Sequence, residues 1–92
     1  MNFIKKAATT GIIGGSGIYR MAGMDGGGWT RLRSSFGEPS DQAFEGTVGN
    51  ARALFLPRHG RGHHLPPSAV NYRANIEGLK VAGCQNVLAV LS

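Results

Sequence analysis

ALFLPRHG, residues 53–60, decides the fold, because four apolar residues there lead into a proline and then into a basic loop. An apolar run without alternation is typical of a strand that is covered on both faces. The following stretch, residues 57–67, is rich in glycine and proline and is expected to be an irregular loop. We therefore predict a buried strand with polar groups gathered at its carboxyl end.

The chain before this strand contains a predicted hairpin and a second apolar strand. The hairpin joins residues 44–48 to residues 52–56 through Gly49-Asn50, two residues that tolerate positive φ. Residues 9–14 form the second strand candidate, which ends in glycines. The sequence thus predicts at least three strands upstream of the irregular loop.

The segment between the first strand and the hairpin is less regular. Residues 18–24 are compatible with one or two helical turns, and Gly26-Gly27-Gly28 is expected to break any regular element. Residues 29–34 alternate in polarity and are compatible with a strand, whereas residues 36–41 are typical of a loop.

A helix and a last strand are predicted after the irregular loop. Ser68 is a good N-cap for a helix to about residue 82, and Gly83 is well placed to end it in a left-handed conformation. Residues 86–91 follow as a strand that is apolar throughout from Val87 to Leu91. The apolar stripe of the helix is predicted to comprise Tyr72, Ile76, Leu79 and Ala82.

The order strand, hairpin, loop, helix, strand predicts an α/β fold with at least one right-handed crossover. A buried strand at residues 86–91 needs neighbours and covering helices, and the 92 residues do not go on to supply them. We therefore expect residues 1–92 to be a truncated portion of a single domain.

Composition limits the class of partner. Ten Lys and Arg against five Asp and Glu give a net charge of +5, but the basic residues are scattered and form no recognisable nucleic-acid module. A small anion is a better match than a nucleic acid. No apolar run is long enough to span a bilayer, and the single cysteine, Cys84, suggests a reducing compartment. We expect a cytoplasmic protein.

The first candidate site is GIIGGSG, residues 11–17. Glycines after a strand let successive N–H groups point at one anion, and Ser16 would add a hydroxyl donor. A dinucleotide-binding motif would need glycine at Arg20, and no Gly-Lys pair of a P-loop is present. From spacing alone, a tight structural turn and an anion-binding turn both remain open.

The second candidate site is RHGRGHH, residues 58–64, directly after the buried strand. Arg58 could hold phosphate with two hydrogen bonds, and His59 could donate another. A solvated basic loop is equally compatible with this spacing. A metal site is less so, because His63 and His64 adjoin without a nearby cysteine or carboxylate at ligand spacing. We expect no metal.

Four blocks of the chain resemble the purine nucleoside phosphorylase family, in the branch of methylthioadenosine and methylthioinosine phosphorylases. The blocks keep the family's order and spacing, and the similarity runs from about Gly11 to Val90. They comprise residues 11–18, 36–40, 57–63 and 67–76.

This resemblance implies the N-terminal part of a phosphorylase/hydrolase-like α/β fold with a central mixed sheet, usually assembled as a homotrimer. It implies cleavage of a purine nucleoside by inorganic phosphate, giving free base and (methylthio)ribose 1-phosphate, without a cofactor. The family's phosphate contacts match Gly15, Ser16, Arg58 and His59.

The chain departs from the family after its last strand. The family continues with a small polar or alanine pair and a glycine-rich turn, where this chain has Leu91 and Ser92. No general acid for the leaving base is recognisable in the 92 residues, so no catalytic residue is assigned and the chain is expected to be inactive alone. The alternatives are a non-catalytic phosphate-binding module and a pseudogene relic.

Overall fold

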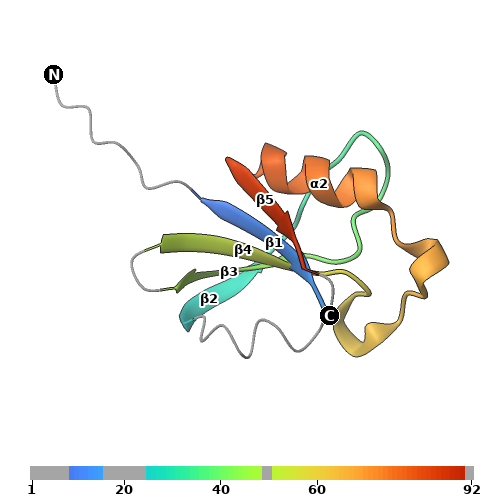
Figure 1. The fold of residues 1–92 in the computed structure, drawn as a ribbon, viewed down its shortest axis with the longest axis horizontal. Helices are drawn as coiled ribbons and strands as arrows, with labels where there is room; N and C mark the ends of the chain where they lie inside the picture. Colours follow the sequence, from blue (N-terminus) through green and yellow to red (C-terminus); the bar gives the residue numbers. More distant parts are fainter. Residues whose placement is uncertain (1–8, 16–24, 49–50, 91–92) are drawn as a thin grey trace, which may run out of the picture.

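The computed structural model describes residues 9–15, 25–48 and 51–90 and consists of a five-stranded mixed sheet with one helix packed on it (Figure 1). The strand order is β2-β3-β4-β1-β5, in which β4, β1 and β5 are parallel and β2, β3 and β4 are antiparallel. The predicted α/β class and mixed sheet are confirmed. The strands comprise β1 (Thr10–Gly14), β2 (Asp25–Thr30), β3 (Ala43–Val48), β4 (Ala51–Pro57) and β5 (Asn86–Ala89).

The stretch that decides the fold is the buried strand β4, as predicted. It hydrogen-bonds to β3 on one side and to β1 on the other. Leu54, Phe55 and Leu56 are at most 3% exposed. The predicted hairpin between β3 and β4 is also confirmed, with pairing from Val48↔Ala51 to Phe44↔Phe55; its Gly49-Asn50 connection lies outside the described residues.

The first hairpin strand pairs with β2, and here the sequence prediction was wrong. A strand was expected at residues 29–34, with a break at the three glycines 26–28. Instead, β2 runs from Asp25 to Thr30 through those glycines, with a register shift between Asp25 and Gly28. Pairing with β3 overrides the low strand propensity of glycine, and such irregularities are where strand glycines are common. The helical turns expected at residues 18–24 lie outside the described residues.

The helix begins later than predicted. α2 spans Tyr72–Val81, and its N-cap is Asn71, whose side chain accepts a hydrogen bond of 3.0 Å from the Ala74 N–H. Ser68 lies instead in a separate 3-10 turn, η2 (Pro67–Ala69). The extended backbone at Val70 separates the two elements, so Ser68 cannot cap the helix.

The helix ends as predicted. Gly83 has φ of +108° and donates to Lys80 O, while Cys84 N donates to Leu79 O, both at 3.0 Å. This pair of bonds is a Schellman motif, and it is completed by packing of Leu79 and Cys84 in one apolar cluster. Burial raises the pKa of the Cys84 thiol, so this cysteine is a packed core residue with little thiolate character.

The face of α2 that packs on the sheet differs from the predicted stripe. Of the four stripe residues only Leu79 is buried, and Tyr72 and Ile76 are 51% and 42% exposed. The buried residues are Ala74, Asn75, Gly78 and Leu79. A Cβ on Gly78 would lie 3.1 Å from Leu32, so the small residues allow the helix to approach the loop of residues 31–42 closely.

Strand β5 lies at an edge of the described sheet. It pairs with β1 alone among the described strands, and Leu88 is 57% exposed. This agrees with the expectation that an apolar strand at residues 86–91 lacks neighbours and covering helices within the 92 residues. Val87 is partly buried and packs against the apolar core cluster. Among the described residues, no helix is both long and apolar enough to cross a bilayer.

Candidate anion-binding site

The two predicted anion-binding stretches meet at one edge of the sheet. β1 and β4 are parallel neighbours with Gly14 opposite Pro57, and Arg58 N donates to Gly14 O at 2.9 Å. Gly15 and Arg58 therefore leave neighbouring strands side by side, at the carboxyl edge where ligands of α/β sheets gather (Figure 1). Ser16 lies outside the described residues. Binding of phosphate by these residues stays a prediction.

Arg58 connects the ends of all three parallel strands. Its guanidinium Nη1 donates to Val90 O at 2.9 Å, and Val90 N donates to Ile13 O at 2.7 Å. The side chain thus reaches past the end of β1 to the chain that leaves β5. Arg58 is half-buried, and it forms no ion pair with a carboxylate of the described residues. The positive charge of Arg58 can therefore bind an anionic ligand.

His59 closes the loop that follows β4. Its Nδ1 lies 2.9 Å from Leu65 O, and Leu65 N donates back to His59 O at 2.9 Å. A carbonyl oxygen only accepts, so Nδ1 carries the proton, and Nε2 accepts a long hydrogen bond of 3.3 Å from Arg58 Nε. To donate to phosphate as predicted, Nε2 would have to gain a proton and release Arg58 Nε.

Glycine is required at the turn between these residues and the rest of the loop. Gly60 has φ of +77°, a conformation that residues with a Cβ rarely adopt, and a Cβ there would contact the His64 ring. Gly60 N also donates to Pro57 O at 3.0 Å. The loop was predicted to be irregular; it contains two short 3-10 turns, η1 (Arg61–His63) and η2.

The second arginine of the loop has a different role from the first. Arg61 forms an ion pair with Asp41, with 2.9 Å between Nη2 and Oδ1, and its guanidinium lies over the Trp29 ring. The motif therefore contains one arginine directed at the strand ends and one held by a carboxylate. Sequence reasoning missed Asp41, since it lies 20 residues from Arg61 and just outside the block of residues 36–40.

The histidines after Arg61 form no metal centre within the described part of the chain, where no three His, Cys, Asp or Glu residues gather. His64 Nδ1 lies 3.0 Å from Arg61 O, which gives that ring a role in the loop itself. The side chain of His63 lies outside the description.

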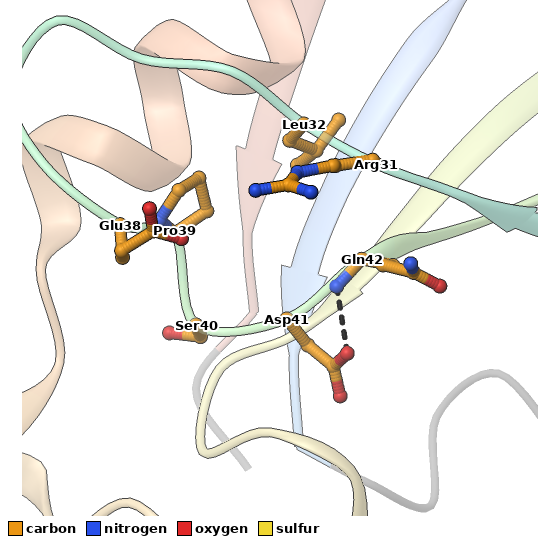
Figure 2. A pocket seen from close by; sticks show the side chains of 7 residues that line it. All are labelled: Arg31, Leu32, Glu38, Pro39, Ser40, Asp41 and Gln42. Atoms are coloured by element: carbon orange, nitrogen blue, oxygen red, sulfur yellow. Dashed lines mark hydrogen bonds between the residues drawn. The ribbon is translucent and has the colours of Figure 1, made fainter.

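A separate pocket of about 290 Å³ opens beside residues 31–42 (Figure 2). Figure 2 shows the Arg31 side chain across the pocket from Glu38 and Pro39, and the Asp41 carboxylate accepting a hydrogen bond of 2.6 Å from Gln42 N. Its wall contains the carboxylates of Glu38 and Asp41 as well as the guanidinium of Arg31, and Asp41 is already paired with Arg61. None of the predicted phosphate ligands lines it.

Comparison with known proteins identifies relatives of high similarity. No protein-family model matches the chain. The chain is 54% identical over 80 residues to the S-methyl-5'-thioadenosine phosphorylase of Rhodospirillum rubrum, covering 87% of this chain and 27% of the relative. It is 49% identical over 84 residues to the purine nucleoside phosphorylase of Streptomyces coelicolor, covering 91% and 29%.

Solved structures give the same result. A methylthioadenosine phosphorylase from an antarctic soil metagenomic library superimposes with a TM-score of 0.79 at 42% identity, over 92% of this chain and 30% of that one. Methylthioadenosine phosphorylase from Schistosoma mansoni in complex with tubercidin gives 0.77 at 48% identity, over 89% and 29%. The predicted resemblance is confirmed, and the chain spans about 30% of the length of these relatives.

Proposed function

We propose that this chain forms the phosphate-binding part of a purine nucleoside phosphorylase that acts on 5′-methylthioadenosine, methylthioinosine or a related nucleoside. The observation that carries the proposal is the meeting of Gly15 and Arg58 at neighbouring strand ends, where Arg58 N bonds to Gly14 O at 2.9 Å. Relatives that are about 50% identical and carry phosphorylase names support it.

The chemistry of phosphorolysis suits these groups. An oxygen of inorganic phosphate forms a bond to C1′ of the ribose while the C1′–N bond breaks, and the bonding electrons leave with the base, which takes up a proton. The ribosyl centre becomes cationic in between, so a phosphate held close to it both stabilises that charge and attacks it. Arg58 would hold two phosphate oxygens, and N–H groups of the turn at Gly15 and Ser16 would hold others.

His59 would join this site through Nε2. Its Nδ1 is bonded to Leu65 O, so Nε2 is the ring nitrogen that would face an anion. Arg58 Nε, which now donates to Nε2, would turn to the phosphate as well.

The resemblance extends the proposal to the complete enzyme. We propose a homotrimer in the cytoplasm that uses inorganic phosphate as co-substrate and no cofactor, with neither nucleic acid nor a membrane as partner. We assign the contacts to ribose and base to sequence beyond these 92 residues, since the chain spans about 30% of its relatives. The isolated chain is then expected to bind phosphate without turnover.

A chimera tests the enzymatic proposal. In it, this chain replaces the matching 80 residues of the Rhodospirillum rubrum relative, to which it is 54% identical. We expect phosphate-dependent release of adenine from methylthioadenosine, and loss of that release on Arg58→Gln. Arg33→Gln is the matched control, because Arg33 is exposed and forms no ion pair among the described residues.

The outcomes separate the alternatives. A folded but inactive chimera, together with saturable phosphate binding by the 92-residue chain, would favour a non-catalytic phosphate-binding module. Phosphate-dependent cleavage of methylthioadenosine by the 92-residue chain alone would contradict the assignment of ribose and base contacts to other sequence.

A further inference from the structure

We propose that Asp41 is a positioning residue for the phosphate site, because through Arg61 it fixes the loop that carries Arg58 and His59. The effect on phosphate binding rests on the proposed function. The position of the loop does not, since it can be measured without any ligand.

The Asp41 carboxylate is bonded to the loop at three points. Oδ2 accepts from Arg61 N at 2.7 Å and from Arg61 Nε at 3.0 Å, while Oδ1 accepts from Nη2 at 2.9 Å. The Asp41 side chain is only 10% exposed. A forked pair of this kind fixes orientation as well as distance, and the added backbone bond ties the main chain of the loop directly.

An aromatic ring holds the other face of the guanidinium. Arg61 Cζ lies 4.0 Å from the centroid of the Trp29 ring, which in turn meets Phe44 edge to face at 5.4 Å. Arg61 is thus held between a carboxylate and a ring that belongs to the β2–β3 pair. Such a cation over a ring adds attraction that an exposed ion pair lacks.

Asp41 is itself held in place by α2. Its neighbour Ser40 donates from its backbone N–H to Asn75 Oδ1 at 2.7 Å, and Asn75 Nδ2 donates to Ser40 Oγ at 3.0 Å. Asn75 is fully buried. Hydrogen bonds thus join the helix to Ser40 and join Asp41 to Arg61, and the peptide bond between residues 40 and 41 connects the two sets. From Arg61 the loop leads back to Arg58.

The charge of Asp41 is maintained by these contacts. Burial raises the pKa of the Asp41 carboxyl, but hydrogen bonds from Arg61 and Gln42 and the positive charge of Arg61 outweigh burial and hold the pKa below its ordinary value. Because Asp41 neutralises Arg61, Arg58 is, among the described residues, the arginine at this edge that has no carboxylate partner. The pair thus directs an anion to the strand ends and keeps the loop in position.

The test compares Asp41→Asn with Glu45→Gln in the 92-residue chain. Glu45→Gln is matched, since it removes one carboxylate from an arginine pair, with Arg52, on the exposed hairpin. For Asp41→Asn we expect hydrogen exchange of the Leu65 amide, measured without phosphate, to become about tenfold faster, because the loop loses about the free energy of one charge-assisted hydrogen bond. Because the same loop carries Arg58 and His59, we expect inorganic phosphate to bind about tenfold more weakly as well.

Two further measurements identify the mechanism. Trp29 is the only tryptophan, so its fluorescence should change in Asp41→Asn and stay constant in Glu45→Gln.

Arg61→Gln alters an exposed side chain and keeps the test informative if Asp41→Asn fails to fold. Combining Asp41→Asn with Arg61→Gln should weaken phosphate no further than either change alone, since the two residues act as one unit.

Unchanged Leu65 exchange and unchanged phosphate affinity in Asp41→Asn would overturn the proposal, as would equal effects of Glu45→Gln. If the unaltered chain binds no phosphate, the proposed function fails by that result. The faster Leu65 exchange in Asp41→Asn would then still establish Asp41 as the anchor of the loop, and its absence would refute that too.

Discussion

Strands β4 and β5 have similar apolar sequences and are both parallel neighbours of β1, yet one is buried and the other exposed. In β4, Leu56 is fully buried, whereas Leu88 in β5 is 57% exposed. β4 has strands on both sides, and β5 pairs only with β1 among the described strands. An apolar run thus indicates that a strand is suited to burial. Whether the strand is buried depends on the strands and helices that pack against it.

The difference in burial between β4 and β5 extends to the two segments that follow these strands and contribute to the candidate site. The chain after β4 enters a loop held by Asp41, by its own hydrogen bonds and by Gly14. The chain after β5 contributes Val90 O, the acceptor from Arg58. An exposed apolar edge strand favours association with other chains, so the β5 side is the less protected part of the described sheet.

The largest expected effect tests the contrast directly. Leu56→Ala should lower the free energy of unfolding by about 2–5 kcal/mol, because it leaves a cavity in the core. Leu88→Ala removes atoms that are mostly in water and should cost less than about 1 kcal/mol. Urea unfolding of both variants, followed by circular dichroism, measures the difference. Equal losses would show that β5 is buried in solution, for instance by self-association.

The next effect extends the contrast to a buried polar group. Asn75→Ala leaves Ser40 N–H and Oγ in a buried position without their partners. We expect a loss of about 1–3 kcal/mol in the free energy of unfolding. Adding Ser40→Ala should restore little, since the Ser40 backbone N–H remains unsatisfied. If Asn75→Ala has no effect, the bonds between α2 and residue 40 do not contribute to stability.

A smaller effect is expected where α2 leads the chain into β5. Gly83 has φ of +108°, a conformation that alanine adopts only with strain. Gly83→Ala should therefore cost about 1–2 kcal/mol in thermal unfolding. Val81→Ala is the control, because Val81 is 65% exposed. Equal costs for the two variants would mean that the Schellman motif does not fix the start of β5.

The smallest effect is a response to acid at the β4 end. Because the folded-state pKa of Asp41 lies below its ordinary value of 3.8, the stability that it contributes is present above pH 3.8 and is lost as the pH falls through the lower folded value. Wild type and Asp41→Asn should therefore converge in stability below pH 3.8 and differ above it. Glu77, whose pKa is also lowered by bonds from Ser34 and Ser35, is present in both chains and cancels in the comparison. A constant difference at every pH would contradict the assignment.

Strands with strong local signals could be predicted from the sequence, whereas features set by partners could not. β1, β3 and β4 have apolar or alternating runs, and Gly83 ends the helix as its residue type suggests. The glycines of β2 are in a strand only because β3 pairs with them. Likewise Asn75 and Gly78 are buried by contacts with Ser40 and Leu32, which lie some 35 residues or more away.

In the candidate site too, residues with a local sequence signal could be predicted, whereas contacts between distant segments could not. Gly15 and Arg58 were predictable, since residues at the ends of parallel strands gather at one edge. Their adjacency was not, because it depends on β1 pairing with β4. The hydrogen bonds between Asp41 and Arg61 join two loops 20 residues apart, and a contact between loops leaves no periodic signal in the sequence.

The most direct test of phosphate binding at the strand ends is a titration of the 92-residue chain with inorganic phosphate, followed by amide NMR shifts. We predict saturable shifts confined to residues 14–16 and 58–60, and their loss in Arg58→Gln but not in Arg33→Gln. Saturable shifts centred on residues 31–42, or no saturable shifts at any residue, would contradict the account.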